Sequence, residues 1–204
     1  IRDSSVTGVQ TCALPILPGV ELVRNGSRGL LWLEPLVEVD TPQGRVAYGP
    51  VSASAVDALV KADFLNGGDH PLKLGDIETH PWFVAQDRVT FARVGVVDPH
   101  SLDDFRAHGG YVGLTRALGM ESIAIVEEVL ASGLRGRGGA GFPAGLKWKT
   151  VLAADSTQKY ICCNADEGDS GTFADRMLME GDPFTLIEGM TIAALGVGAG
   201  YGYI

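Results

Sequence analysis

Cysteine is scarce in this chain of 204 residues, which has only three. An iron–sulfur cluster held by thiolates needs four cysteines, so the chain alone is excluded as a complete cluster carrier. Cys162 and Cys163 are neighbours in an apolar run, and adjacent residues of a strand point to opposite faces, so these two cannot converge on one metal. We therefore expect no metal site, and we interpret both as small buried residues in a reducing compartment, the cytoplasm.

Basic residues and long hydrophobic runs are also lacking. Lys and Arg total 16 against 25 Asp and Glu, for a net charge of −9, and this balance disfavours a nucleic-acid partner, which needs a basic surface. The most apolar run, 184–200, is interrupted by Glu188 and is shorter than the roughly 20 residues of a membrane span. We predict a buried helix there, capped by Asp182 and started by Pro183, and no membrane span.

Glycine, by contrast, is concentrated in the segment 133–142, where it occupies five of ten positions in GLRGRGGAGF. Glycine tolerates positive φ and lets a ligand approach the main chain, whose N–H groups can donate to phosphate oxygens. Arg135 and Arg137 can add charge-assisted contacts. The alternative is a flexible linker, but linkers are rich in Ser, Thr and Asn, and none occurs here. The segment therefore predicts a phosphate cradle, in which we expect a positive φ at Gly138.

The same segment contains G-x-G-x-x-G at Gly136, Gly138 and Gly141. In a Rossmann dinucleotide site this motif follows a strand. Here the preceding residues, 120–131, have apolar positions three and four apart, which predicts a helix. A second helix is predicted over 144–154, and its N-terminal dipole would face the same ligand. The pattern indicates a nucleotide site of another kind.

A second polar loop follows the apolar run 159–164, which predicts a buried strand. The residues from 164 to 173, NADEGDSGTF, place an amide, three carboxylates and two glycines after its carboxyl end, where open α/β sheets bind ligands. Asp, Asn and Gly are also common turn residues, so a simple turn is the alternative. Two polar loops that flank one helix favour a ligand, with phosphate on the first loop and ribose or flavin on the second.

These motifs, together with Lys147-Trp148 and the segment 171–176, resemble the NADH-binding flavoprotein subunit of respiratory complex I. Its soluble relatives belong to NAD-dependent molybdenum formate dehydrogenases and NAD-reducing hydrogenases. In that family, FMN takes a hydride from NADH and passes electrons singly to iron–sulfur clusters. The resemblance, continuous from about residue 105, implies FMN and NAD as cofactors, a diaphorase-type oxidoreductase subunit without a catalytic acid or base, and partner subunits that carry iron–sulfur clusters and molybdenum.

The resemblance also implies roles for single residues. FMN contacts are implied for Gly136, Arg137, Gly138, Lys147, Asn164, Asp166 and Glu167. The border of the NADH pocket is implied for Gly139, Ala140, Gly141, Phe142 and Asp169. Complex I commonly has a glutamate where Asp169 stands, and the formate dehydrogenase and hydrogenase branches share the aspartate. The family's [4Fe–4S] ligands lie further downstream, so that cluster is expected in a full-length protein only.

The upstream residues predict a separate small unit. A weak alternation over 30–39, a turn with a short strand at 44–49 and a helix over 54–65 resemble the second half of a thioredoxin-like [2Fe–2S] domain, without its cluster cysteines. The residues 25–35, NGSRGLLWLEP, are most similar to the beta subunit of NAD-dependent formate dehydrogenase. The break at 66–71 predicts that a linker arm follows.

The expected architecture is therefore α/β, a thioredoxin-like half domain followed by the N-terminal part of a Rossmann-like FMN-binding domain. The boundaries are 17–65 for the first, 66–104 for the linker arm and 105–204 for the second. Residues 1–16 resemble translated sequencing adapter more than a signal peptide. We expect the flavin domain to be incomplete and this fragment to be inactive alone. The alternatives to an electron-transfer flavoprotein are a nucleotide-binding module without redox activity and an inert scaffold.

Overall fold

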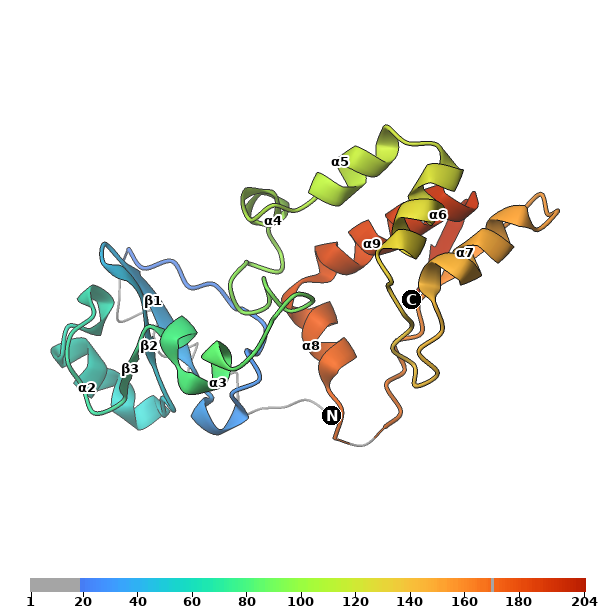
Figure 1. Cartoon of the computed structure of the whole chain (residues 1–204). Helices are drawn as coiled ribbons and strands as arrows, with labels where there is room; N and C mark the ends of the chain where they lie inside the picture. Colours follow the sequence, from blue (N-terminus) through green and yellow to red (C-terminus); the bar gives the residue numbers. More distant parts are fainter. Residues whose placement is uncertain (1–18, 170) are drawn as a thin grey trace. The chain divides into compact units, whose positions relative to one another are not determined.

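The computed structural model describes residues 19–169 and 171–204, which form two compact units, and the boundary between unit 1 and unit 2 lies between Ala92 and Arg93. Figure 1 shows their helices and strands. The adapter-like residues 1–16 lie outside the described part. The described residues confirm a mixed α/β structure with small sheets.

Unit 1 contains an antiparallel sheet with the strand order β1-β2-β3. Strands β1 and β2 form a hairpin, in register from Val37 opposite Tyr48 to Thr41 opposite Gly44, and the turn is compatible with the φ of +117° at Gly44. The predicted order of strand, hairpin and helix is confirmed. The elements are η1 (Leu31–Leu33), β1 (Val37–Thr41), β2 (Gly44–Tyr48), η2 (Ala53–Ala55), α2 (Val56–Lys61), η3 (Phe64–Asn66), β3 (Lys73–Gly75), η4 (Ile77–Thr79) and α3 (Pro81–Val84).

The sheet of unit 1 is buried on both faces. Ala47 and Tyr48 are adjacent in β2 and fully buried, and adjacent strand residues point to opposite faces. Tyr48 packs in a cluster with Val56 and Leu59 of α2, whose apolar spacing predicted this face of the helix. Ala47 packs in a second cluster with Leu30, Ile77 and Phe83.

The prediction of a linker arm over 66–104 is wrong. Strand β3 pairs with β2, with Gly75 opposite Ala47, and Ile77 is only 2% exposed. The residues that follow Ala92 belong to unit 2, where Val94 and Val97 are fully buried. Because β3 pairs with a strand far upstream and has only three residues, no local periodicity marks it.

A buried arginine occupies the loop in which the thioredoxin-like resemblance would place cluster ligands. The Arg28 guanidinium donates to Glu38 at 2.7 Å and also pairs with Glu78. It lies 5.6 Å from the centre of the Phe83 ring. A buried charge is tolerated only when it is paired and hydrogen-bonded, so this loop is a part of the unit 1 core.

Unit 2 contains a parallel strand pair joined by helices. Strands β4 and β5 pair in register from Tyr160 opposite Tyr201 to Cys162 opposite Tyr203, and α8 and α9 form the crossover, as parallel strands require. The predicted helices before and after the glycine-rich segment are confirmed. The elements are α4 (Leu102–Ala107), α5 (Val112–Leu118), α6 (Ser122–Ala131), α7 (Ala144–Ala153), β4 (Tyr160–Cys162), α8 (Ala174–Gly181), α9 (Pro183–Val197) and β5 (Tyr201–Tyr203).

Helix α9 is the central element of unit 2 and contacts α5, α6 and α7 (Figure 1). It starts as predicted, with Pro183 in its first turn and the Asp182 side chain accepting the Thr185 N–H. Asp182 is 1% exposed and pairs with the Arg93 guanidinium at 2.9 Å. Of the helices in the described ranges, none is both long enough and apolar enough to cross a membrane.

The predictions of a buried strand and of buried cysteines are wrong. Tyr160 is 52% exposed, Cys162 is exposed and Cys163 is half-buried. In the described part of the chain, β4 pairs only with β5, so its other edge has no neighbouring strand. The apolar composition of the run indicated a strand but did not reveal how many neighbours would cover it.

Candidate functional site

The glycine-rich segment forms a loop that is closed at its base by main-chain hydrogen bonds. The Gly136 N–H donates to the Phe142 carbonyl at 2.8 Å, and the Ala144 N–H donates to the Leu134 carbonyl at 2.8 Å. These two bonds bracket an antiparallel bridge just before α7. The residues between Gly136 and Phe142 therefore project as a short hairpin-like loop between α6 and α7.

The two arginines of this loop have different surroundings. Nη1 of Arg135 donates to the Gly141 carbonyl at 2.8 Å, so this side chain bonds across the base of the loop. Arg137 is exposed, and none of the described residues pairs with it. The expectation that both arginines face a ligand is therefore supported only for Arg137.

The tip of the loop presents unused donors. Within the described residues, none of the backbone N–H groups from 137 to 142 donates a hydrogen bond, and 137–140 are exposed. The positive φ values are +97° at Gly139 and +59° at Gly141. The expectation of a positive φ at Gly138 is wrong, although a Cβ there would meet nothing within 4 Å. Consecutive free N–H groups beside an arginine suit an anion, so the residues present fit a phosphate.

Helix α7 follows the loop directly and is held against α6 by a glycine. A Cβ on Gly145 would lie 2.4 Å from the Leu130 nitrogen, a distance that no side chain can occupy. Lys147 lies two residues further along α7, is exposed and has no ion-pair partner among the described residues. It also lines an open pocket of about 480 Å³, together with Trp148, Cys162 and other residues of α7, β4, α8 and α9.

The acidic loop after β4 uses two of its polar side chains to build its own structure. The Asn164 side-chain oxygen accepts the Asp166 N–H at 3.1 Å, a local turn of the kind asparagine favours. The Glu167 carboxylate accepts the backbone N–H groups of Asp175 at 2.9 Å and Arg176 at 3.0 Å. Both donors lie in the first turn of α8, so Glu167 caps that helix from outside.

The capping contacts lower the pKa of Glu167. Burial acts to raise this pKa, but the backbone N–H donors of Asp175, Arg176 and Ala174 together outweigh it, because they bond the charged form. Glu167 also has a φ of +49°, which is uncommon for a residue with a side chain. The turn interpretation therefore holds for Asn164 and Glu167, whatever else they bind.

Asp166 and Asp169 are the available carboxylates of the acidic loop. Both are exposed, and neither side chain has a hydrogen-bond or ion-pair partner in the ranges that the structure describes. No hydrogen bond or ion pair joins this loop to the glycine loop within those ranges. Figure 1 shows both loops leaving the helices of unit 2 on the same side of the view.

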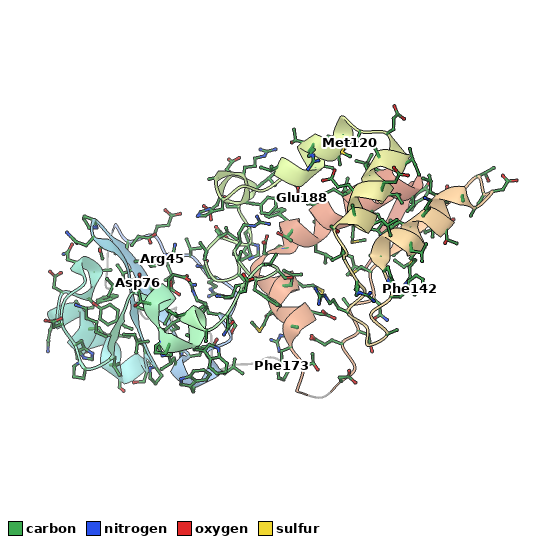
Figure 2. All side chains as sticks on the ribbon, viewed as in Figure 1. Arg45, Asp76, Met120, Phe142, Phe173 and Glu188 are labelled. Atoms are coloured by element: carbon green, nitrogen blue, oxygen red, sulfur yellow. The ribbon has the colours of Figure 1, made fainter. Side chains whose placement is uncertain are left out.

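The sequence did not predict the structural role of Glu188, a buried acid. Glu188 is 9% exposed, and its two oxygens accept the N–H groups of Tyr111 and Leu114 at 2.9 Å each. Figure 2 labels Glu188 on the ribbon of α9, in the same unit as Phe142. In the sequence Glu188 only interrupted an apolar run. Because an acid inside a buried helix is rarely left without a partner, its position was the signal that could have predicted these hydrogen bonds.

Part of the chain matches a known family of domains. Residues 129–204 match the Nuo51 FMN-binding domain of the Complex1_51K family. This segment is therefore similar to the FMN-binding domains of that family. The matched residues include the closed glycine loop, Lys147 and the acidic loop. The resemblance to the NADH-binding flavoprotein subunits is therefore confirmed.

Curated relatives are similar over a longer stretch. The chain is 51% identical over 117 residues to the F 2 subunit of NADH-quinone oxidoreductase of Rhizobium meliloti, covering 57% of this chain and 28% of that protein. It is 47% identical over 119 residues to the HndC subunit of the NADP-reducing hydrogenase of Solidesulfovibrio fructosivorans, covering 58% and 24%. The chain thus spans about a quarter of the length of these relatives.

A solved structure of an NAD⁺-reducing [NiFe]-hydrogenase in the H₂-reduced state is also similar. The sequence identity is 28%, and the match covers 77% of this chain and 25% of that chain, with a TM-score of 0.43.

Proposed function

We propose that residues 105–204 bind FMN, with its phosphate at the tip of the glycine loop, and serve as part of a flavoprotein subunit that oxidises NADH. The observation that carries this proposal is the row of N–H groups over 137–142 and the adjacent Arg137 guanidinium, none of which bonds to any residue that the structure describes. The match to an FMN-binding domain supports the choice of flavin among phosphate ligands.

The remaining residues of the site have complementary roles in this proposal. Lys147 adds positive charge one turn into α7, close to the helix N-terminus that follows the loop. Asp166 and Asp169 offer acceptors to the hydroxyl groups of the ribityl chain and of NADH. Asn164 and Glu167 hold the acidic loop in shape and keep spare hydrogen-bonding capacity toward FMN. Gly136, Gly138, Gly139, Ala140, Gly141 and Phe142 supply the main-chain surface.

The chemistry that bound FMN would supply is the acceptance of a hydride from NADH and the release of electrons one at a time. The chain's own contribution is orientation and charge, so no side chain is needed as acid or base. Electrons would pass to iron–sulfur clusters of the complete subunit and of partner subunits in the cytoplasm. The same proposal includes a Rossmann-like fold, in which β4 and β5 are two strands of a larger parallel sheet.

The finer assignment that we propose is the beta subunit of an NAD-dependent molybdenum formate dehydrogenase. The sequence of residues 25–35 supports it, and so does the order of strand, hairpin and helix in the segment 17–65, which a thioredoxin-like half domain would have. The second candidate is a subunit of a hydrogenase or of complex I, favoured by the identities to the HndC and F 2 subunits. Molybdenum or nickel in the purified native complex separates these candidates.

The experiment that tests flavin binding uses a chimera. The 117 aligned residues of the Rhizobium protein are replaced by those of this chain, and FMN content is measured after purification. We expect FMN in the parent chimera, with large losses in Arg137→Ala and Lys147→Ala. Arg116→Ala is the matched control, because Arg116 pairs with Glu128 on the surface of the same unit.

The outcomes separate the three function classes. A chimera that holds FMN and reduces ferricyanide with NADH supports the redox proposal. FMN without NADH oxidation favours a nucleotide-binding module, and a folded chimera without FMN favours a scaffold. Equal FMN content in Arg137→Ala and Arg116→Ala would contradict the assignment of the loop tip.

A further inference from the structure

The glycine loop contains two arginines that are two positions apart but have different partners. Arg135 bonds the Gly141 carbonyl at 2.8 Å, and Arg137 bonds none of the described residues. By composition alone, Arg135 and Arg137 are equivalent sources of positive charge. Their contacts indicate two distinct tasks.

We propose that Arg135 is a positioning residue, which preforms the anion cradle by fixing the peptide between Gly141 and Phe142. This inference rests on the proposed function for its purpose, since a preformed cradle matters only if an anion binds there. The geometry of the loop can be tested without the anion.

The peptide between Gly141 and Phe142 has a fixed polarity. Among the described residues, cis peptide bonds occur only before Pro35 and Pro50, so this bond is trans. In a trans peptide the C=O and N–H groups point in opposite directions. Because Arg135 holds the carbonyl, the Phe142 N–H is turned to the other side, where it bonds none of the described residues.

The direction of the peptide dipoles decides whether the loop attracts an anion. A carbonyl oxygen turned into the loop would repel a phosphate, and an N–H group would attract it. Arg135 keeps the Gly141 carbonyl engaged, while the Phe142 carbonyl is engaged by the Gly136 N–H. Two consecutive carbonyls are thereby held by donors, and the neighbouring N–H groups are left for an anion.

The glycines of the loop make it costly to order. The loop has positive φ values at Gly139 and Gly141, and glycine loses more conformational freedom on ordering than other residues. A side-chain bond that bridges the base before ligand binding removes part of that cost from the binding step. Arginine suits this task, because its planar guanidinium donates in a fixed direction and lysine does not.

The test measures amide hydrogen exchange in the full chain, in Arg135→Ala, Arg135→Lys and Arg137→Ala. We expect Arg135→Ala to raise exchange at Gly136 and Ala144 about tenfold, as for the loss of one hydrogen bond from a charged donor. Helices α6 and α7 should keep their protection, which shows that the fold persists. Arg137→Ala should leave the loop closed, and Arg135→Lys should restore part of the protection.

Titration of the same variants, made in the chimera, with FMN and, separately, with inorganic phosphate completes the test. In Arg135→Ala the affinity should fall and saturating ligand should restore protection at Gly136, whereas in Arg137→Ala the affinity should fall with the loop already closed. Unchanged exchange in Arg135→Ala, or equal opening in Arg137→Ala, would overturn the inference. If Arg135→Ala opens the loop and neither ligand binds any of these proteins, the positioning role stands and the proposed function fails.

Discussion

The glycine loop and the acidic loop both have the composition of ligand loops, yet they distribute their polar groups differently. The first closes through main-chain bonds and Arg135, and its tip N–H groups donate to none of the described residues. The second engages Asn164 and Glu167 in its own turn and in the capping of α8, and the side chains of Asp166 and Asp169 have no partner in the described ranges. Composition therefore indicates what a loop can bind, and contacts separate the residues that build it from those that remain available.

The largest effect is expected where α7 is held against α6, because this contact fixes the two helices that the glycine loop connects. Gly145→Ala would place a Cβ 2.4 Å from the Leu130 nitrogen. We expect a loss of about 1–3 kcal/mol in the free energy of unfolding, the usual cost of overpacking. Chemical denaturation of the full chain measures it.

Gly189→Ala is the matched control for this substitution. Gly189 lies inside α9, and an added Cβ meets nothing within 4 Å. Since alanine is favoured over glycine in a helix, we expect a gain of about 0.5–1 kcal/mol. Equal losses in both variants would show that the close contact between α6 and α7 is unimportant.

The next-largest effect is expected at Gly139, whose backbone conformation differs from that of its neighbour Gly138. Gly139 has a φ of +97° and Gly138 lies outside that region. Gly139→Ala should strain the backbone by about 1–2 kcal/mol, which corresponds to about a 5- to 30-fold loss of FMN affinity. Gly138→Ala should fold without strain and Gly138→Val should block the ligand by bulk alone. The FMN content of the chimera is measured for all three variants. A larger loss of FMN in Gly138→Ala than in Gly139→Ala would contradict the loop geometry.

The features that the sequence predicted are local ones. The helices around the glycine loop follow from apolar residues three and four apart, and the start of α9 follows from Asp182 and Pro183. The hypothesis that the loop is an anion cradle also rests on a local signal, its glycines and arginines. Each of these signals lies within one helix or one turn, where spacing is sufficient evidence.

The features that the sequence did not predict depend on residues far apart in the chain. Glu188 bonds Tyr111 across 77 positions, and β3 pairs with a strand that lies well upstream. The exposure of Cys162 depends on which strands and helices cover β4. The different contacts of Arg135 and Arg137 required the path of the backbone, since both have the same chemistry.

A smaller effect is expected in the acidic loop, where Glu167 caps α8. Its folded-state pKa lies below the ordinary carboxyl value, so its contribution is fully present above about pH 4.3 and is lost as the pH falls through the lower folded value. We expect exchange at the Asp175 and Arg176 amides to rise in that acid range. Glu167→Gln should raise exchange at neutral pH and flatten this pH dependence.

Glu180→Gln is the control for the capping role, because Glu180 pairs with Arg176 on the exposed side of the same helix. It should leave the pH dependence intact. In the chimera, Glu167→Gln should lower NADH:ferricyanide activity while FMN content largely persists. Unchanged exchange together with unchanged kinetics would contradict both the capping role and the ligand role.

The smallest effect is expected at Asp169, whose exposed side chain has no partner among the described residues. Substitution there should change the free energy of unfolding by less than about 0.5 kcal/mol. Asp169→Asn removes the charged acceptor and should raise KM for NADH about three- to tenfold in the chimera, with FMN content unchanged. Asp169→Glu keeps the charge on a side chain one methylene longer and should leave KM close to that of the parent. If Asp169→Asn has the parent KM, the acidic loop contributes no contact to NADH at this position.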